Sequence, residues 1–467
     1  MELKLSEVLK DNDSKRIDSE YFKKHYLQFI SLLKSKNHLI LNDDSNIKGG
    51  KRLPLGDEFS ENGTPYIRAE DNKKGFVDFD TSPKITDETY QKIKAYQTNF
   101  NDVLITNVGN SIGDVGIVKF SLDKCNLTEN CIKIINLKEN NPNYIFSFLN
   151  SKYGNLQILR ETVGTAQPKL AIERVRNFKI PILSNYFQLK IETLVNKSHQ
   201  TLEQSKTLYK QSEEILLKEL DLLDFEPSKE KVAIKSFSDS FGSSGRLDSE
   251  YYLPMYDEVI GRIKKVKYDT LLNIVDINKS IETGSEAYQD EGIEYIRVAN
   301  LYKMGLTPSK IFLDNDFFDT ETVEKLQPKK DTILLSKDGT VGIAYAIKNE
   351  RNIITSGAIL HLSIRDKECV LPEYLTLVLN SLVVQMQSKR DAGGSIIKHW
   401  KPSEIGEVLI PIIDINIQTQ IEEKIKESFK LKEESKRLLE VAKRAVEMAI
   451  EEGEDMGMGF IKDEVDL

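Results

Sequence analysis

The feature that most constrains this chain is an internal repeat. The segment RIDSEYF at positions 16–22 returns as RLDSEYY at positions 246–252, a displacement of 230 positions in a chain of 467 residues. Later echoes keep this displacement to within one residue: Tyr-Ile-Arg at 66–68 and 295–297, Leu-Asn-Ser at 149–151 and 379–381, and Ile-Pro-Ile at 180–182 and 410–412. A duplicated globular unit is the economical explanation. It predicts internal pseudo-twofold symmetry, which suits duplex DNA or a pair of partner subunits.

The composition is typical of a chain that folds into globular domains. With 39% hydrophobic and 30% charged residues, it can bury sizeable cores and form roughly three or four domains. No apolar run approaches the roughly 20 residues that a membrane span needs, and the N-terminus lacks the apolar stretch of a signal peptide. We therefore expect a cytoplasmic protein with no membrane association.

Cysteine content and charge narrow the possible sites. The cysteines are Cys125, Cys131 and Cys369, an odd number without the paired spacing of a zinc site, so we expect reduced thiols and no bound metal. The net charge is −9, but residues 451–467 hold seven acidic residues and one lysine, which leaves −3 for the other 450 residues. A nearly neutral body can still present basic faces to phosphate. We expect the acidic tail to be disordered.

Both halves run through the same order of local patterns. Each opens with an amphipathic helix, continues with short β-branched and aromatic segments broken by glycine, and then forms another helix and a glycine-containing loop before Ile-Pro-Ile. We therefore predict a mixed α/β (α+β) fold with a curved sheet in each half. The predicted elements are helices around 21–33, 144–159, 256–263 and 374–386, and strands at 64–68, 102–106 and 113–118.

A long polar helix with a narrow apolar seam follows each Ile-Pro-Ile. About 35 residues at about 1.5 Å each give a helix of roughly 50 Å, and a small residue recurs every seven positions. One interpretation is that each helix packs on its own domain with its serines in solvent. We favour antiparallel pairing of the two helices as a coiled coil, which would space the domains by more than one DNA turn of about 34 Å. The predicted seam comprises Ile191, Val195, Ser198, Leu202, Ser205, Tyr209, Ser212, Leu216, Ile421, Ile425, Ser428, Ser435, Leu439, Ala442 and Val446.

This arrangement resembles the specificity subunit of type I restriction-modification systems. The resemblance rests on the repeated Arg-(Ile/Leu)-Asp-Ser-Glu-Tyr segment, Gly-Lys-Arg at 50–52, Tyr-Ile-Arg in both halves, the turns at 111–113 and 340–342, and Ile-Pro before each long helix. It covers nearly the whole chain. It implies two target recognition domains, at 1–184 and 236–413, a first spacer helix with its linker at 185–235, a second spacer helix at 414–450, and the acidic tail at 451–467.

The same resemblance implies partners and a cofactor. Each recognition domain would read one half of a bipartite, asymmetric site in double-stranded DNA, and the helices would dock two adenine methyltransferase subunits. Those subunits would bring S-adenosylmethionine, whereas this chain would bind no cofactor. Motor-nuclease restriction subunits could join for cleavage. The chain itself would be a noncatalytic part of the methylating or restricting complex.

No catalytic arrangement emerges from the residues themselves. Asn-Pro-Asn-Tyr at 141–144 is similar to an adenine methyltransferase motif, but its third residue is wrong and it is more typical of a helix start. Asp57, Glu70 and Lys73 are too loosely spaced for a nuclease carboxylate cluster. His25 and His199 fall within predicted helices and are interpreted as structural. A methyltransferase or nuclease with an unrecognised centre, and a protein scaffold that does not read DNA, stay open as alternatives.

Polar and basic loop residues are the candidates for DNA contact. Arginine and lysine can contact guanine, asparagine and glutamine can pair with adenine, and glycine permits close backbone approach. In the first half the candidates are Lys48, Lys51, Arg52, Arg68, Lys73, Lys74, Asn107, Asn110, Gln167 and Lys169. In the second half they are Lys279, Ser280, Thr283, Arg297, Asn300, Lys337, Ser395, Lys398 and His399.

Comparison of the two halves suggests how to sort these candidates. Positions shared by both copies should maintain the fold or bind phosphate, whereas divergent loop positions should specify bases. Arg68 and Arg297 recur, so a structural role competes with DNA contact, and Trp400 is expected to be buried. Lys51 and Arg52 have no basic counterpart in the second half. The two domains should therefore read different half-sites.

Overall fold

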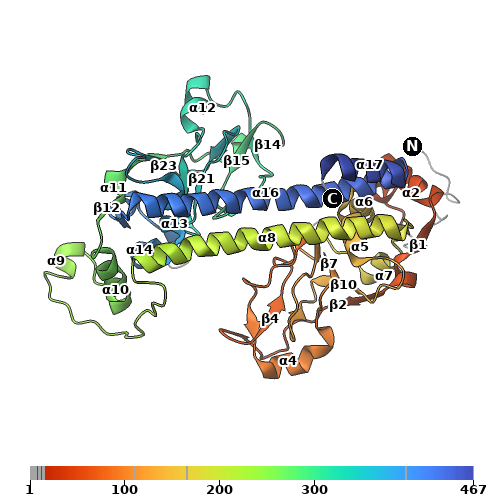
Figure 1. The fold of residues 1–467 in the computed structure, drawn as a ribbon, viewed down its shortest axis with the longest axis horizontal. Coiled ribbons are helices and arrows are strands. Elements are labelled where there is room, and N and C mark those ends of the chain that lie inside the picture. Colours follow the sequence, from red (N-terminus) through yellow and green to blue (C-terminus); the bar gives the residue numbers. More distant parts are fainter. Residues whose placement is uncertain are drawn as a thin grey trace. The chain divides into compact units, whose positions relative to one another are not determined.

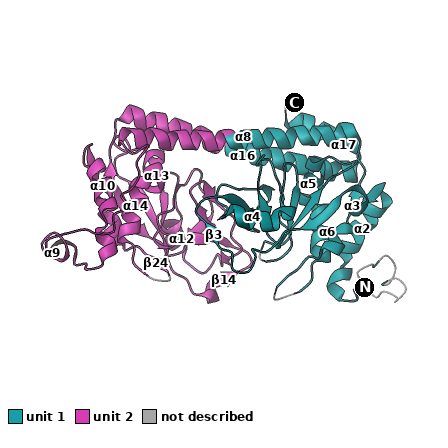
Figure 2. Cartoon of the chain, turned by 90° about the horizontal axis from the view of Figure 1, so that it is seen from below, with its two compact units in different colours: residues 1–203, 432–467 teal, residues 204–431 magenta. Residues whose placement is uncertain are grey.

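The chain divides into two compact units. The structure, a computed structural model, describes residues 8, 12, 16–109, 111–164, 167–394 and 397–465. The first unit comprises residues 1–203 and 432–467, and the second comprises residues 204–431 (Figure 2). Each unit therefore contains one α/β domain and a segment of both long helices.

A five-stranded sheet forms the centre of the first unit. Its strand order is β2-β10-β7-β8-β5, and a smaller sheet has the order β3-β6-β4-β9. β7 pairs antiparallel with both β10 and β8, whereas β5 pairs parallel with β8. The strands are β1 (His38–Ile40), β2 (Asn46–Gly49), β3 (Phe59–Ser60), β4 (Thr64–Ile67), β5 (Gly75–Phe76), β6 (Lys84–Ile85), β7 (Val103–Thr106), β8 (Val115–Ile117), β9 (Asn126–Leu127), β10 (Cys131–Ile135) and β11 (Lys179–Pro181). The strands predicted at 64–68, 102–106 and 113–118 are thus present as β4, β7 and β8.

Helices cover one face of this sheet. β7 is buried along its whole length: Val103 and Ile105 join the core beneath the helices, while Leu104 points to a separate cluster on the other face. This alternation follows from the two-residue period of a strand. The helical elements are η1 (Ser19–Phe22), α2 (Lys24–Ser35), α3 (Leu41–Asp44), α4 (Asp87–Ile93), η2 (Lys94–Tyr96), α5 (Pro142–Asn150), α6 (Lys152–Glu161) and α7 (Ile172–Arg176). Of these, α2, α4, α5, α6 and α7 are labelled in Figure 1.

The second unit repeats this plan. Its central sheet has the order β13-β23-β19-β21, and Ile333 and Leu335 of β19 face the helices while Leu334 faces the opposite cluster. The main strands are β12 (Tyr268–Thr270), β13 (Val275–Lys279), β15 (Ile293–Ile296), β19 (Ile333–Ser336), β20 (Asp338–Gly339), β21 (Ala344–Ala346), β22 (Ile353–Thr355), β23 (Ile359–Ile364), β24 (Lys398–His399) and β25 (Leu409–Pro411). The helical elements are α9 (Phe241–Ser244), η3 (Ser249–Tyr252), α10 (Pro254–Ile263), α11 (Leu271–Ile274), η4 (Ser285–Ala287), η5 (Val298–Asn300), α12 (Thr320–Leu326), α13 (Pro372–Asn380), α14 (Leu382–Asp391) and α15 (Pro402–Gly406).

One predicted helix in each half is broken in two. The segment expected as a helix from 144 to 159 forms α5 and α6, separated by Ser151 in an extended conformation. A Cβ on Gly154 would lie 2.3 Å from the Phe148 carbonyl oxygen, so the chain turns sharply where only glycine fits. Ser381 divides α13 from α14 in the same way.

The long helices are α8 (Asn185–Glu219) and α16 (Ile415–Glu451). They pair through buried serines in both units: the Ser198 hydroxyl donates to the Ser435 carbonyl at 2.8 Å, and Ser205 donates to the Ser428 carbonyl at 2.7 Å. In the second unit the Lys424 side chain also donates to the Gln211 side chain. The two helices are antiparallel, because the contacts move from Ser205 to Gln211 along α8 while they move back from Ser428 to Lys424 along α16.

The seam that joins these helices matches the predicted heptad positions. All the predicted seam residues are buried except Leu202 and Leu439, which are half-buried. Because the serines are buried, the alternative interpretation, in which they face solvent, is wrong. It also explains their size, because a hydroxymethyl group allows the two helix backbones to approach closely enough for side-chain to main-chain hydrogen bonds.

The acidic tail differs from the expected disordered segment. Residues Glu454–Glu464 form α17, and Ile461 and Val465 are buried against the first unit. Glu454 accepts a hydrogen bond from the Ser184 amide at 2.7 Å. Composition misled here because a few apolar residues on one helix face provide the burial that orders the segment. Within the described part of the chain, no helix is long and apolar enough to cross a membrane.

Candidate nucleic-acid interface

Two loops predicted to contact DNA lie together in the first unit. We name them the β7 loop, residues 107–113, and the α6 loop, residues 163–169. Val108 and Lys169 form an antiparallel bridge, and the Leu170 amide donates to the Asn107 carbonyl at 3.0 Å. The α6 loop is closed at its base by two reciprocal hydrogen bonds between Val163 and Lys169, of 2.9 and 2.8 Å.

The second unit holds two loops in the equivalent arrangement. The β19 loop, residues 337–343, contains β20, and the α14 loop, residues 393–399, ends in β24. Asp338 pairs with His399, and the Trp400 amide donates to the Lys337 carbonyl at 2.8 Å. Gly393 and His399 exchange hydrogen bonds of 3.0 and 2.7 Å. Every one of these contacts matches one in the first unit at a displacement of 230 residues.

Both paired loops turn at a glycine that the geometry requires. Gly164 has a φ of 94° and Gly394 a φ of 109°, in the left-handed region that other residues avoid. A Cβ on Gly394 would lie 2.0 Å from the Ile397 carbonyl oxygen. Both copies of the repeat therefore have, at this position, a backbone conformation that favours glycine.

The candidate side chains on these loops have mixed surroundings. Gln167, Lys169, Lys398 and His399 are exposed, as a DNA-contacting role requires. Asn107 is half-buried, and its Oδ1 has no hydrogen-bond partner in the described part of the molecule. Two further candidates, Asn110 and Ser395, lie outside the described residues.

Asp338 is a residue of this site that the sequence alone does not indicate. Its carboxylate forms an ion pair with Lys337 and lies 2.8 Å from the His399 Nδ1, so one acid orients two candidate DNA-contacting side chains. The first unit has Val108 at the equivalent position. Only the spatial pairing of the two loops reveals this role, because 61 residues separate Asp338 from His399.

The basic candidates on and after β2 are accessible. Lys48 is exposed on β2, and Lys51 lies with its ammonium 5.9 Å from the centre of the Tyr96 ring. The Arg52 side chain is 81% exposed and donates to Glu129 at 2.6 Å. Lys73 and Lys74 precede β5 and are also exposed. A phosphate can reach each of these cations, although Arg52 must first exchange its carboxylate partner.

The shared arginines occupy different environments. Arg68 forms ion pairs with Glu70 and with the buried Asp71, which favours the structural interpretation for that residue. Arg297 is exposed, and its backbone amide donates to Asn300.

Two of the remaining candidates of the second unit, Ser280 and Asn300, donate side-chain hydrogen bonds to main-chain carbonyls of the same unit. Thr283 is buried, at 8% exposed, whereas we expected an exposed loop position. Ser280 donates to the Thr355 carbonyl at 2.5 Å, and Asn300 donates to the Pro308 carbonyl at 3.3 Å. Lys279 is exposed at the end of β13. Trp400 is buried, as predicted.

The acidic and thiol groups form no catalytic cluster among the described residues. Asp57 accepts from Lys92 and Thr89, while Glu70 pairs with Arg68, so the carboxylates considered for a nuclease have separate partners. Asn141 is the N-cap of α5, with proline in the first turn, as expected for a helix start. Burial raises the pKa of the Cys125 and Cys131 thiols to about 12. No group of three or more potential metal ligands occurs in the described ranges.

A buried lysine, Lys119, and a half-buried lysine, Lys432, lie at the helix pair in the first unit. The Lys119 ammonium donates to Asn101 and to Asn196 of α8, at 2.9 and 2.8 Å. Burial lowers the pKa of Lys119 to about 8 and, more than any other cause, lowers that of Lys432 on α16 to about 8. Phe76 packs edge-on against His199, which supports the structural interpretation of this histidine. These contacts attach the α/β domain to the helices of its own unit.

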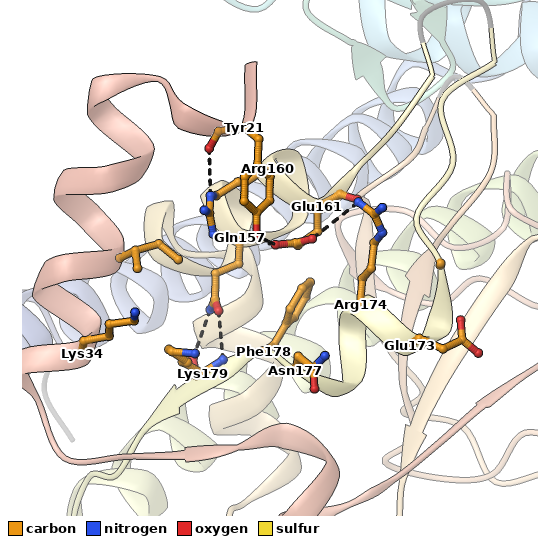
Figure 3. Close-up of a pocket in the computed structure, with 12 residues that line it drawn as sticks. Tyr21, Lys34, Gln157, Arg160, Glu161, Glu173, Arg174, Asn177, Phe178 and Lys179 are labelled. Atoms are coloured by element: carbon orange, nitrogen blue, oxygen red, sulfur yellow. Dashed lines mark hydrogen bonds and ion pairs between the residues drawn. The ribbon is translucent and has the colours of Figure 1, made fainter. Parts of the chain in front are cut away.

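A cavity of the first unit lies where the repeated N-terminal segment meets the end of α6. Tyr21, Arg160, Glu161 and Arg174 line it and are joined by hydrogen bonds and ion pairs (Figure 3). It lies immediately before the α6 loop.

Residues 16–210 match a family model described as the type I restriction modification DNA specificity domain. The chain therefore contains a DNA specificity domain of the type I restriction-modification kind. The second unit repeats the fold and loop contacts of this specificity domain. No curated protein sequence matches the chain.

Two solved structures match most of the chain at low sequence identity. The S subunit of a type I restriction-modification system from M. genitalium is 14% identical, with a TM-score of 0.36 over 92% of this chain and 96% of that chain. The HsdS subunit from Thermoanaerobacter tengcongensis is also 14% identical, with a TM-score of 0.29 over 89% of this chain and 97% of that chain.

Proposed function

We propose that this chain is the noncatalytic specificity subunit of a type I restriction-modification complex and that its two units read the two halves of a bipartite, asymmetric DNA site. The observation that carries the proposal is the paired-loop arrangement, which recurs at a displacement of 230 residues with the same main-chain contacts. A recurring backbone with changing side chains is what two readers of different sequences need.

The divergence lies at the exposed positions of these loops. Gln167 and Lys169 of the first unit correspond to Ile397 and His399 of the second. Glutamine can pair with adenine and lysine can contact guanine, whereas isoleucine offers an apolar contact for a thymine methyl group. The two loops would therefore prefer different base pairs.

The long helices would space the two readers and dock partners. α8 has 35 residues and α16 has 37, which correspond to about 50 Å of helix each. Their seam is held by apolar contacts and by serine hydrogen bonds, so a change of its length would change the spacing between the half-sites. Two adenine methyltransferase subunits would bind this chain and supply S-adenosylmethionine. Restriction subunits would join the same assembly for cleavage.

The test is the methylation pattern of DNA in cells that hold the partner methyltransferase. With this chain present, adenines should be methylated at one bipartite sequence with a fixed spacer, and without it that methylation should be lost. Methyl transfer by the purified chain alone, measured with labelled S-adenosylmethionine, would contradict the noncatalytic assignment. An unchanged methylation pattern without the chain would overturn the proposed function.

A further inference from the structure

The repeated Arg-x-Asp-Ser-Glu-Tyr segment forms a clasp against the end of α6. We define the clasp by Arg16, Asp18, Tyr21 and Arg160. The Asp18 carboxylate accepts two hydrogen bonds of 2.6 Å from Arg16, which fixes the guanidinium in one plane. Both arginines lie close to the Tyr21 ring, with the guanidinium carbons of Arg16 and Arg160 4.9 and 3.5 Å from the ring centre.

The fixed guanidinium of Arg16 contacts the last carbonyls of the helix. Its Nη1 donates to the Arg160 carbonyl at 2.7 Å and to the Thr162 carbonyl at 3.1 Å. Carbonyls at a helix C-terminus have no partner within the helix and carry partial negative charge, so a cation there stabilises that end. Thr162 directly precedes Val163, where the α6 loop begins.

The remaining clasp contacts fix the same end from the other side. Arg160 donates to the Tyr21 carbonyl at 3.0 Å, and the Tyr21 hydroxyl donates to Glu161 at 2.9 Å. Arg174, beyond the loop, donates to the Glu161 carbonyl at 2.9 Å. The two ends of the α6 loop are thereby tied to one cluster (Figure 3).

The second unit contains a similar clasp, in which the carbonyl acceptor is that of Asp391, the counterpart of Glu161. Arg246 is held by Asp248 through hydrogen bonds of 2.8 and 2.6 Å and donates to the Asp391 carbonyl at the end of α14 at 3.0 Å. Arg246 and Arg390 lie with their guanidinium carbons 4.4 and 5.0 Å from the centre of the Tyr251 ring. The α14 loop begins two residues later.

The arginines and the tyrosine of the clasp are too enclosed to read bases themselves. The side chains of Arg16 and Arg160 are 13% and 8% exposed, and Tyr21 is 3% exposed. Their donors are directed to carbonyl and carboxylate oxygens within the unit. A role through the loop that they hold is the one that this geometry permits.

We propose that the Arg-x-Asp-Ser-Glu-Tyr segment is a positioning device that sets the conformation of the DNA-facing loop of its own unit, through Arg16 for the α6 loop and Arg246 for the α14 loop. The proposal rests on the proposed function for its effect on DNA. Its structural part concerns the free protein and is tested without DNA.

The first experiment compares hydrogen exchange in the full-length chain and in two variants. Arg16→Ala should speed amide exchange in the α6 loop by about tenfold or more and leave the α14 loop unchanged, and Arg246→Ala should do the reverse. Arg16→Lys keeps the charge but cannot bind Asp18 and the carbonyls together, so it should show the same effect in a variant that folds. Glu20→Gln is the matched control, because Glu20 is an exposed member of the same segment that pairs with Lys23.

The second experiment maps methylated adenines when each variant is combined with the partner methyltransferase. Arg16→Ala should relax one half-site, Arg246→Ala the other, and Glu20→Gln neither. Unchanged loop exchange in Arg16→Ala and Arg16→Lys would overturn the proposal, as would faster exchange spread evenly over the first unit. Faster loop exchange without any change in the methylated sequence would instead contradict the proposed reading of DNA by these loops.

Discussion

Gly394→Ala is expected to impair recognition of one DNA half-site without unfolding the chain. Gly394 has a φ of 109°, and its added Cβ would lie 2.0 Å from the Ile397 carbonyl oxygen inside the α14 loop. Gly393 is a neighbour in the same loop, and a Cβ there would meet no atom within 4 Å. The two substitutions add the same methyl group one residue apart, so Gly393→Ala is a matched control.

The magnitude follows from the backbone. A left-handed conformation costs a residue with a β-carbon about 1–2 kcal/mol, and the contact with a main-chain oxygen cannot be relieved by rotating a side chain. The loop must therefore rearrange, at a total cost of about 2 kcal/mol or more. If DNA binding requires the original conformation, affinity for the preferred half-site should fall at least about tenfold, because 1.4 kcal/mol corresponds to a factor of ten.

The assay is competition binding by the assembled complex with DNA duplexes that differ in one half-site at a time. Gly394→Ala should reduce discrimination at one half-site and leave the other unchanged, and Gly393→Ala should retain most of it. The melting temperatures of the two variants should differ little, because the loop is peripheral to the core. Equal losses for the two variants, or a loss spread over both half-sites, would refute the reasoning.

Three other predictions concern stability, each measured by denaturant or thermal unfolding. Ser205→Val should lower the free energy of unfolding by about 1–3 kcal/mol, because it removes a buried cross-helix donor and overfills the seam, while Ser205→Ala should cost about 1 kcal/mol. Removal of residues 454–467 should destabilise the first unit by about 2–4 kcal/mol, because the apolar core residues that Ile461 and Val465 cover would become exposed to water. Lys119 has a folded-state pKa of about 8, below its ordinary 10.5, so the unfolded chain binds more protons between these values and stability should rise with pH across that window. Lys119→Met should reduce this rise; an identical pH profile would contradict the role of its burial.

The features that the sequence predicts best are those that recur in it at a regular spacing. The seam from Ile191 to Leu216 was found because a heptad pattern reports helix pairing directly, and its small residues predicted close approach. The repeat register also predicted that the loops at 163–169 and 393–399 are equivalent. These features depend on local spacing, which a sequence displays.

The features that the sequence did not predict depend on distant partners. The break at Ser151 was missed because apolar residues continue on both sides of it at helical spacing. α17 was missed because its buried partners lie at the start of α8, and Glu454 contacts Ser184 across 270 positions. The burial of Thr283 and the pairing of Asp338 with His399 likewise arise from loops that only the fold brings together.

The central claim is that the two units read different DNA sequences through equivalent loops. It is tested most directly by replacing residues 163–169 with the sequence of residues 393–399, a loop of the same length, and mapping methylated adenines in the presence of the partner methyltransferase. The account predicts a methylated sequence altered in one half, with the other half and the spacer length unchanged. An unaltered sequence, or a change in both halves, would contradict it.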